Sequence, residues 1–106
     1  MDSDTTMKYL LCKLIPPRGT FNVDMTEAEA RVMKEHAAYW ADLASRGTAI
    51  AVGPVLDPSG VWGVSICEIR EEESIEAVTV NDPVMQQGLG FRVEVYPMPR
   101  IILRGK

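Results

Sequence analysis

The chain has 106 residues, of which 46% are apolar and 25% charged, and its net charge is −4. These values are typical of one soluble globular domain. The lysines and arginines are scattered, so no basic surface for nucleic acid is expected. No apolar run reaches the length that a membrane span requires, and the polar start resembles neither a signal nor a transit peptide. We therefore expect a cytoplasmic protein that binds neither nucleic acid nor membranes.

The first half of the chain predicts one strand followed by one long helix. Residues 7–15 (MKYLLCKLI) are apolar apart from two lysines and predict a strand. A helix is predicted over residues 26–46, because Thr26 and Glu29 have the spacing of a capping box and Gly47 suits the left-handed position after a helix. The remaining segments are a disordered lead-in and a loop, over residues 1–6 and 18–25.

The second half predicts a hairpin, a shorter helix and a last strand. Turn residues 57–60 (DPSG) separate two apolar runs, which indicates a hairpin. A glutamate run then suits the start of a helix, and Asn81-Asp82-Pro83 ends it. In chain order the predicted elements are strands over 48–55 and 61–69, a helix over 73–80, one further turn over 84–88 and a strand over 91–98. Residues 100–104 (RIILR) indicate either a short strand or a contact with a partner.

The order of these elements is βαββαβ. This order predicts a ferredoxin-like α+β domain over residues 7–98, with a four-stranded antiparallel sheet, two helices on one face, and a tail over 99–106. The strands are too apolar for a sheet with one solvated face, since residues 49–55 carry no charge on either side. We expect a homodimer that packs the two open sheet faces together. The alternative is a monomer with an apolar patch.

The two cysteines and the single histidine argue against a metal site. Cys12 and Cys67 lie in predicted strands, too far apart in sequence for a metal-binding motif. We expect both to be buried free thiols rather than a disulfide. One histidine with dispersed carboxylates offers no ligand cluster. Any chemistry is therefore expected to need neither a metal nor another cofactor.

His36, in the middle of the predicted long helix, is the strongest catalytic candidate. It is the only side chain whose ordinary pKa lies near neutrality. Asp82, in the Asn-Asp-Pro turn, is the acid that we pair with it. If Asp82 bonds one ring nitrogen, the other nitrogen is free to move a proton. The alternative is a partly buried helical histidine without chemistry.

Aromatic residues near His36 and in the hairpin suggest a small-molecule pocket. Three of them could wall an apolar site, although core packing is an equally ordinary role for such residues. The aspartate of the hairpin either reaches the pocket mouth or simply starts a turn. The residues expected to contact a small-molecule substrate are Tyr39, Trp40, Gly53, Pro54, Asp57 and Trp62.

Three charged residues are expected on the sheet face opposite the helices. Lys13, Arg92 and Glu94 share this face if the strands alternate regularly. They could bind an anionic substrate, or they could pair with one another across a dimer. We expect pairing.

Several short fragments, taken together, resemble one known family. They are Glu35-His36-Ala37-Ala38-Tyr39-Trp40, Gly53-Pro54-Val55-Leu56-Asp57, Gly60-Val61-Trp62-Gly63, Asp82-Pro83 and Val95-Tyr96-Pro97. In order and spacing they resemble the YciI-like (YCII-related) family. The resemblance implies a dimeric α+β barrel similar to muconolactone isomerases and small monooxygenases. Val84 departs from the family, which often has an aromatic residue after Asp-Pro, and the chain extends further at both ends.

The resemblance also implies an active site. The family's proposed histidine on the first helix and aspartate in the Asp-Pro turn correspond to His36 and Asp82. We therefore expect a cofactor-free enzyme of the isomerase or lyase type that moves a proton on a small organic molecule. The alternative is a non-catalytic module of the same fold that binds a small molecule or a partner. A deep apolar pocket that reaches His36 would favour the enzyme.

Overall fold

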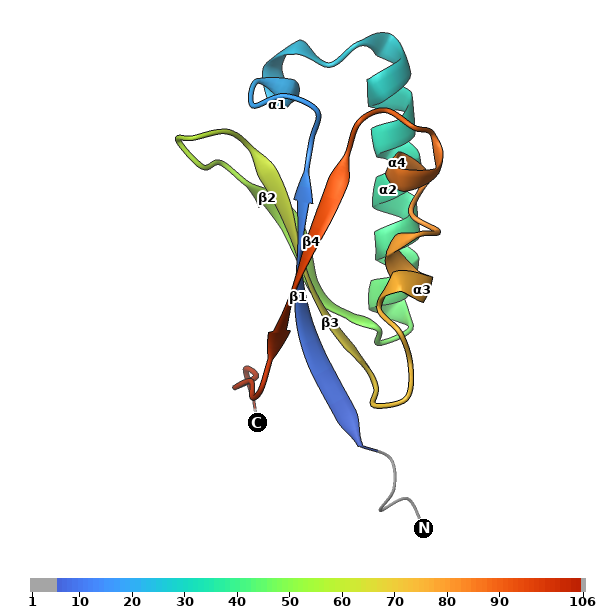
Figure 1. The fold of residues 1–106 in the computed structure, drawn as a ribbon, viewed down its shortest axis with the longest axis vertical. Coiled ribbons are helices and arrows are strands. Elements are labelled where there is room, and N and C mark those ends of the chain that lie inside the picture. Colours follow the sequence, from blue (N-terminus) through green and yellow to red (C-terminus); the bar gives the residue numbers. More distant parts are fainter. Residues whose placement is uncertain (1–5, 106) are drawn as a thin grey trace.

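A four-stranded antiparallel sheet forms the centre of the molecule (Figure 1). The computed structural model describes residues 6–105. The strands are β1 (Met7–Ile15), β2 (Ala49–Val55), β3 (Trp62–Arg70) and β4 (Arg92–Met98), and they lie in the order β2-β3-β1-β4. Each neighbouring pair is antiparallel. This is the ferredoxin-like order, so the predicted α+β fold is confirmed.

The long helix α2 (Glu27–Ser45) begins and ends where the sequence predicts. The Thr26 hydroxyl accepts a hydrogen bond from the backbone N–H of Glu29, and the Glu29 carboxylate accepts one from the backbone N–H of Thr26. These bonds satisfy donors that the first helical turn leaves free. Gly47 has a φ of 88°, which a residue with a side chain adopts with strain. The capping box and the glycine therefore fix both ends of α2.

The structure corrects three of the other predicted segments. A short helix, α1 (Phe21–Asp24), lies inside the predicted loop. The predicted helix over 73–80 is shorter, as α3 (Glu76–Thr79), and it starts three residues later, where the Ser74 hydroxyl accepts a hydrogen bond from the backbone N–H of Glu76. The predicted further turn is α4 (Pro83–Gln86), which starts one residue earlier because Pro83 suits the first helical position. Residues 100–104 form no strand, so that alternative is wrong. The predicted lead-in lies, except for Thr6, outside the described residues.

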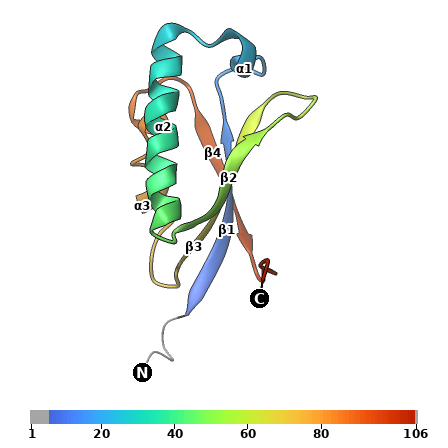
Figure 2. The same ribbon diagram turned by 180° about the vertical axis from the view of Figure 1, so that it is seen from behind.

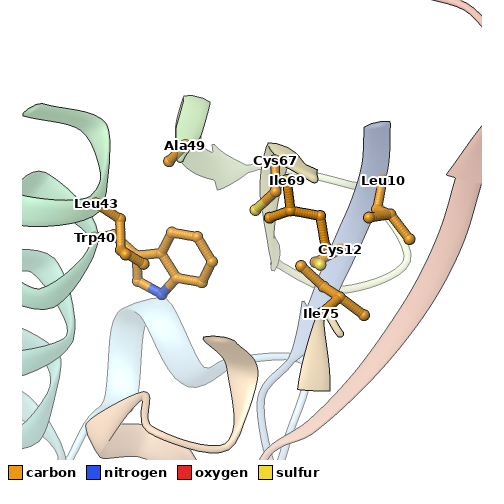
Figure 3. Packing of buried hydrophobic residues seen from close by; sticks show 8 residues of the cluster. All are labelled: Leu10, Cys12, Trp40, Leu43, Ala49, Cys67, Ile69 and Ile75. Carbon is orange, nitrogen blue, oxygen red and sulfur yellow. The ribbon is translucent and has the colours of Figure 1, made fainter. Parts of the chain in front are cut away.

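The long helix α2 and the short helices α3 and α4 pack on one face of the sheet. Figures 1 and 2 show α2, α3 and α4 on the same side. The core lies between α2 and the strands, and Figure 3 shows Trp40 of α2 beside the buried side chains of the sheet. Both cysteines are buried and free, as predicted. No helix within residues 6–105 is long and apolar enough to cross a membrane. The core consists of Leu10, Cys12, Trp40, Leu43, Ala49, Cys67, Ile69 and Ile75.

The other face of the sheet carries apolar and charged side chains that no described helix covers (Figure 1). Lys13 pairs in register with Glu94, which places them on this face together with Arg92. Arg92 forms an ion pair with Glu94 at 3.0 Å. The Lys13 ammonium lies 4.8 Å from the ring centre of Trp62. The predicted sharing of one face is confirmed; Arg92 and Glu94 pair within the chain, and the pairing across a dimer stays a prediction.

Candidate functional site

The two side chains that the sequence analysis pairs are in direct contact. His36 lies in the middle of α2, and Asp82 is the residue before α4, where its carboxylate caps that helix. The His36 Nδ1 atom lies 3.0 Å from Oδ1 and 2.9 Å from Oδ2 of Asp82. The packing of α4 against α2 thus joins residues that are 46 positions apart in the sequence.

The Asp82 carboxylate is buried and held by several donors. Its Oδ2 atom accepts a hydrogen bond of 2.7 Å from the indole nitrogen of Trp40, and its Oδ1 atom accepts one of 3.1 Å from the backbone N–H of Val84. Asp82 is only 3% exposed. A buried carboxylate is tolerated when such partners satisfy its oxygens. Asp82 therefore has a fixed position from which it orients His36.

The contact with Asp82 defines what the imidazole can do. An ionised carboxylate only accepts hydrogen bonds, so Nδ1 of His36 must carry the proton that it donates. In the neutral ring Nε2 then has a free lone pair. The His36 side chain keeps 16% of its surface exposed, and no partner in the described part of the chain bonds to Nε2. The pair therefore has the arrangement of a general base that is oriented by a carboxylate.

A large apolar cavity opens beside His36. Its volume is about 620 Å³, within the roughly 300–1,000 Å³ of small-molecule sites. It lies between α2 and the β2–β3 side of the sheet. Five residues that the sequence analysis assigned to catalysis or substrate contact line it, together with apolar residues that were not anticipated. The first group is His36, Trp40, Gly53, Pro54 and Trp62, and the second includes Phe21, Met25, Met33 and Phe91.

Two of the expected contact residues lie outside the described lining of this cavity. Tyr39 packs edge-on against Trp40 and donates a hydrogen bond to the backbone carbonyl of Val78. Burial raises the pKa of Tyr39, and the negative charge of Asp82 raises it further. Asp57 accepts a hydrogen bond of 3.0 Å from the indole nitrogen of Trp62, so it orients a residue of the cavity wall. Tyr39 and Asp57 therefore contact the cavity-lining residues Trp40 and Trp62 rather than the cavity itself.

A second, much smaller chamber lies behind the large cavity. Its volume is about 30 Å³. The large cavity and the chamber share five residues of their walls: Leu14, His36, Trp40, Val52 and Gly63. Ser65, Thr79 and Asp82 add polar groups to the chamber. Ser65 is not among the residues predicted for the site, because a serine in an apolar strand has no distinctive spacing.

A partly buried ion pair stabilises the part of the large cavity that Phe21 lines. Two nitrogens of the Arg18 guanidinium bond to the two carboxylate oxygens of Glu29, at 3.0 and 2.7 Å. Arg18, together with the backbone N–H of Thr26, lowers the pKa of Glu29 to about 2. Arg18 also donates to Asp24 at the end of α1. The ion pair therefore ties α1, whose Phe21 lines the cavity, to the start of α2.

Comparison with known proteins assigns the chain to a family. Residues 7–99 match the YCII-related domain. No curated protein matches the sequence. Within residues 6–105 no group of three or more histidine, cysteine, aspartate or glutamate side chains could hold a metal ion. The match covers most of the chain and agrees with the ferredoxin-like sheet, so the protein belongs to the YCII-related family.

Proposed function

We propose that the protein is a cofactor-free enzyme that moves a proton on a small organic molecule, in an isomerisation or elimination. One observation carries this proposal. Nδ1 of His36 is held by both oxygens of a buried carboxylate, while the same ring lines an apolar cavity of about 620 Å³. A histidine with a purely structural role would have no need of such a cavity.

The geometry supports a simple sequence of steps. Nε2 of His36 removes a proton from a carbon atom of the substrate, and the electron pair of that C–H bond moves into the substrate. The imidazolium that forms carries a positive charge, and the adjacent Asp82 carboxylate stabilises that charge. Nε2 then returns the proton to another atom of the substrate, or to a leaving group. Proton transfer by a positioned group typically contributes about 10²–10⁴-fold to the rate.

Proton exchange tests this proposal on any small molecule that fits the cavity and carries an acidic C–H bond. Small carbonyl compounds of this kind are first screened for those that raise the melting temperature. The exchange of that C–H proton in D₂O is then followed by NMR. We expect His36→Gln to slow exchange by about 10²-fold or more. The control is Glu35→Gln, which changes an exposed neighbour on α2. Binding without exchange by the wild type would instead support the non-catalytic binding module.

We also propose that the protein is a homodimer that packs through the open sheet face. Leu11 and Ile66 pair in register at the centre of this face, and Leu11 also pairs with Tyr96 of β4. These side chains form an apolar centre, while Arg92 and Glu94 lie toward one end. Apolar centres with polar rims are typical of protein interfaces. Light scattering at micromolar concentration tests the proposal, and a stable monomer would contradict it.

A further inference from the structure

The small chamber behind His36 is the most informative part of the molecule that the proposed reaction leaves unused. Its volume of about 30 Å³ is too small for a substrate but matches the space of about one water molecule, or of one oxygen substituent. It adjoins the large apolar cavity at His36, because the two spaces share five wall residues. A ligand in the large cavity could therefore reach into the chamber with one small group.

The walls of the chamber include one buried hydroxyl group whose neighbours are thiols. Ser65, on β3, is only 6% exposed. The thiols of Cys12 and Cys67 are hydrogen-bonding neighbours of its hydroxyl. Thiols are weak partners. An oxygen acceptor in the chamber would therefore form the strongest hydrogen bond available to Ser65.

The charge in the chamber limits the kind of oxygen that it accepts. Asp82 contributes a carboxylate, and no lysine or arginine is among the described lining residues. A carboxylate or phosphate group would meet like charge in a buried space, which costs free energy. A neutral carbonyl oxygen meets no such penalty. It would also make the neighbouring C–H bond acidic, as a histidine base requires.

From these observations we propose that the chamber binds the carbonyl oxygen of a neutral, largely apolar substrate, and that Ser65 donates a hydrogen bond to it. This inference rests on the proposed function and names its substrate class. The apolar body of the substrate occupies the large cavity. When His36 removes the proton next to the carbonyl group, the electron pair forms a carbon–carbon double bond and the oxygen gains negative charge. The Ser65 hydroxyl stabilises that oxygen until the proton is returned.

Two matched probes test the subsite: acetophenone, labelled with ¹³C at the carbonyl carbon, and ethylbenzene, which has a similar body without the oxygen. NMR titrations give the dissociation constants and the ¹³C shift of bound acetophenone. We expect Ser65→Ala to weaken acetophenone binding about two- to tenfold and to abolish the downfield shift of the carbonyl carbon. Ethylbenzene binding should not weaken. The control is Ser45→Ala, at an exposed position at the end of α2.

A second variant tests the passage between the cavity and the chamber. A Cβ atom at Gly63 would lie 3.7 Å from Cβ of Leu14 and 4.0 Å from the backbone oxygen of Gly53, which are ordinary contacts. Gly63→Ala should therefore fold normally and narrow the passage. We expect it to reduce the downfield carbonyl shift, because the oxygen no longer reaches Ser65.

The subsite and the proposed reaction fail in different ways. If acetophenone does not bind, or if Ser65→Ala changes neither its affinity nor its carbonyl shift, the carbonyl subsite is wrong and the chamber holds water at most. If the shift depends on Ser65 but the methyl protons of acetophenone do not exchange in D₂O, the subsite stands and the proposed enzyme function is wrong. If the subsite and the proposed reaction are both correct, His36→Gln should stop the exchange of the methyl protons but keep the downfield shift of the carbonyl carbon.

Discussion

Replacing Asp82 with asparagine gives the sharpest test of how the site is built. The two oxygens of Asp82 accept hydrogen bonds from the buried indole N–H of Trp40 and from the buried backbone N–H of Val84. An amide has one oxygen, so in either orientation one of these N–H groups loses its acceptor. Leaving a buried donor unsatisfied costs about 1–3 kcal/mol. We expect Asp82→Asn to lower the free energy of unfolding by that amount.

The same substitution should also move a proton on the histidine ring. Nδ1 of His36 lies at nearly equal distances, 3.0 and 2.9 Å, from the two oxygens of Asp82. In either orientation it therefore meets both the oxygen and the NH₂ group of an asparagine. The oxygen still accepts from Nδ1–H, but the NH₂ group donates to an unprotonated Nδ1, so we expect the strict preference for Nδ1–H to be lost and part of the protein to carry the proton on Nε2. With Nε2 protonated, the ring can no longer act as a base toward the cavity.

Urea unfolding and ¹⁵N NMR measure these two effects separately. His36 is the only histidine in the sequence, so its ring nitrogens are assigned without ambiguity in a protein without a histidine tag. The wild type should have the proton on Nδ1, and Asp82→Asn should show a clear fraction of it on Nε2. The control is Asp42→Asn on α2, where the side chain is 62% exposed; we expect it to change stability by less than about 0.5 kcal/mol. An Asp82→Asn variant with wild-type stability and the proton entirely on Nδ1 would refute the reasoning.

Three further predictions concern other parts of the molecule. Ile66→Glu should convert the proposed dimer into a folded monomer by light scattering; a dimer of unchanged affinity would place the interface elsewhere. The pKa of Glu29 is about 2 in the folded protein, against an ordinary 4.5, so its contribution to stability is present above pH 4.5 and is lost as the pH falls toward 2. Glu29→Gln should lack this part of the acid dependence of unfolding, and an identical acid profile would contradict the role of Arg18. Hydrogen bonding to Cys12 and burial raise the pKa of Cys67, so a thiol reagent in mildly alkaline buffer should modify Cys67 only after unfolding; rapid modification of the native protein would show that this part of the core opens.

Local sequence features were enough to predict most of the fold. The capping box of Thr26 and Glu29 and the glycine at position 47 set the ends of α2 correctly. Alternation and turn residues located all four strands to within one residue, because such rules act between residues close together in the chain. The same local rules missed α1 and lengthened α3. Helices of four residues have little periodicity to detect, and tertiary contacts decide where they form.

The candidate site shows the limit of the sequence more clearly. His36 and Asp82 could be selected as residue types, with the family resemblance as support, but their contact depends on how α4 packs against α2. Nothing local to Trp40 indicates that it shares the same carboxylate, or that Tyr39 turns away to a backbone carbonyl. The chamber beside Ser65 exists only because helical segments and all four strands meet there. Short-range patterns thus define the helices and strands and identify the residues whose side chains can carry out chemistry. Sheet register and helix packing decide which of those residues come into contact, because these contacts join positions far apart in the chain.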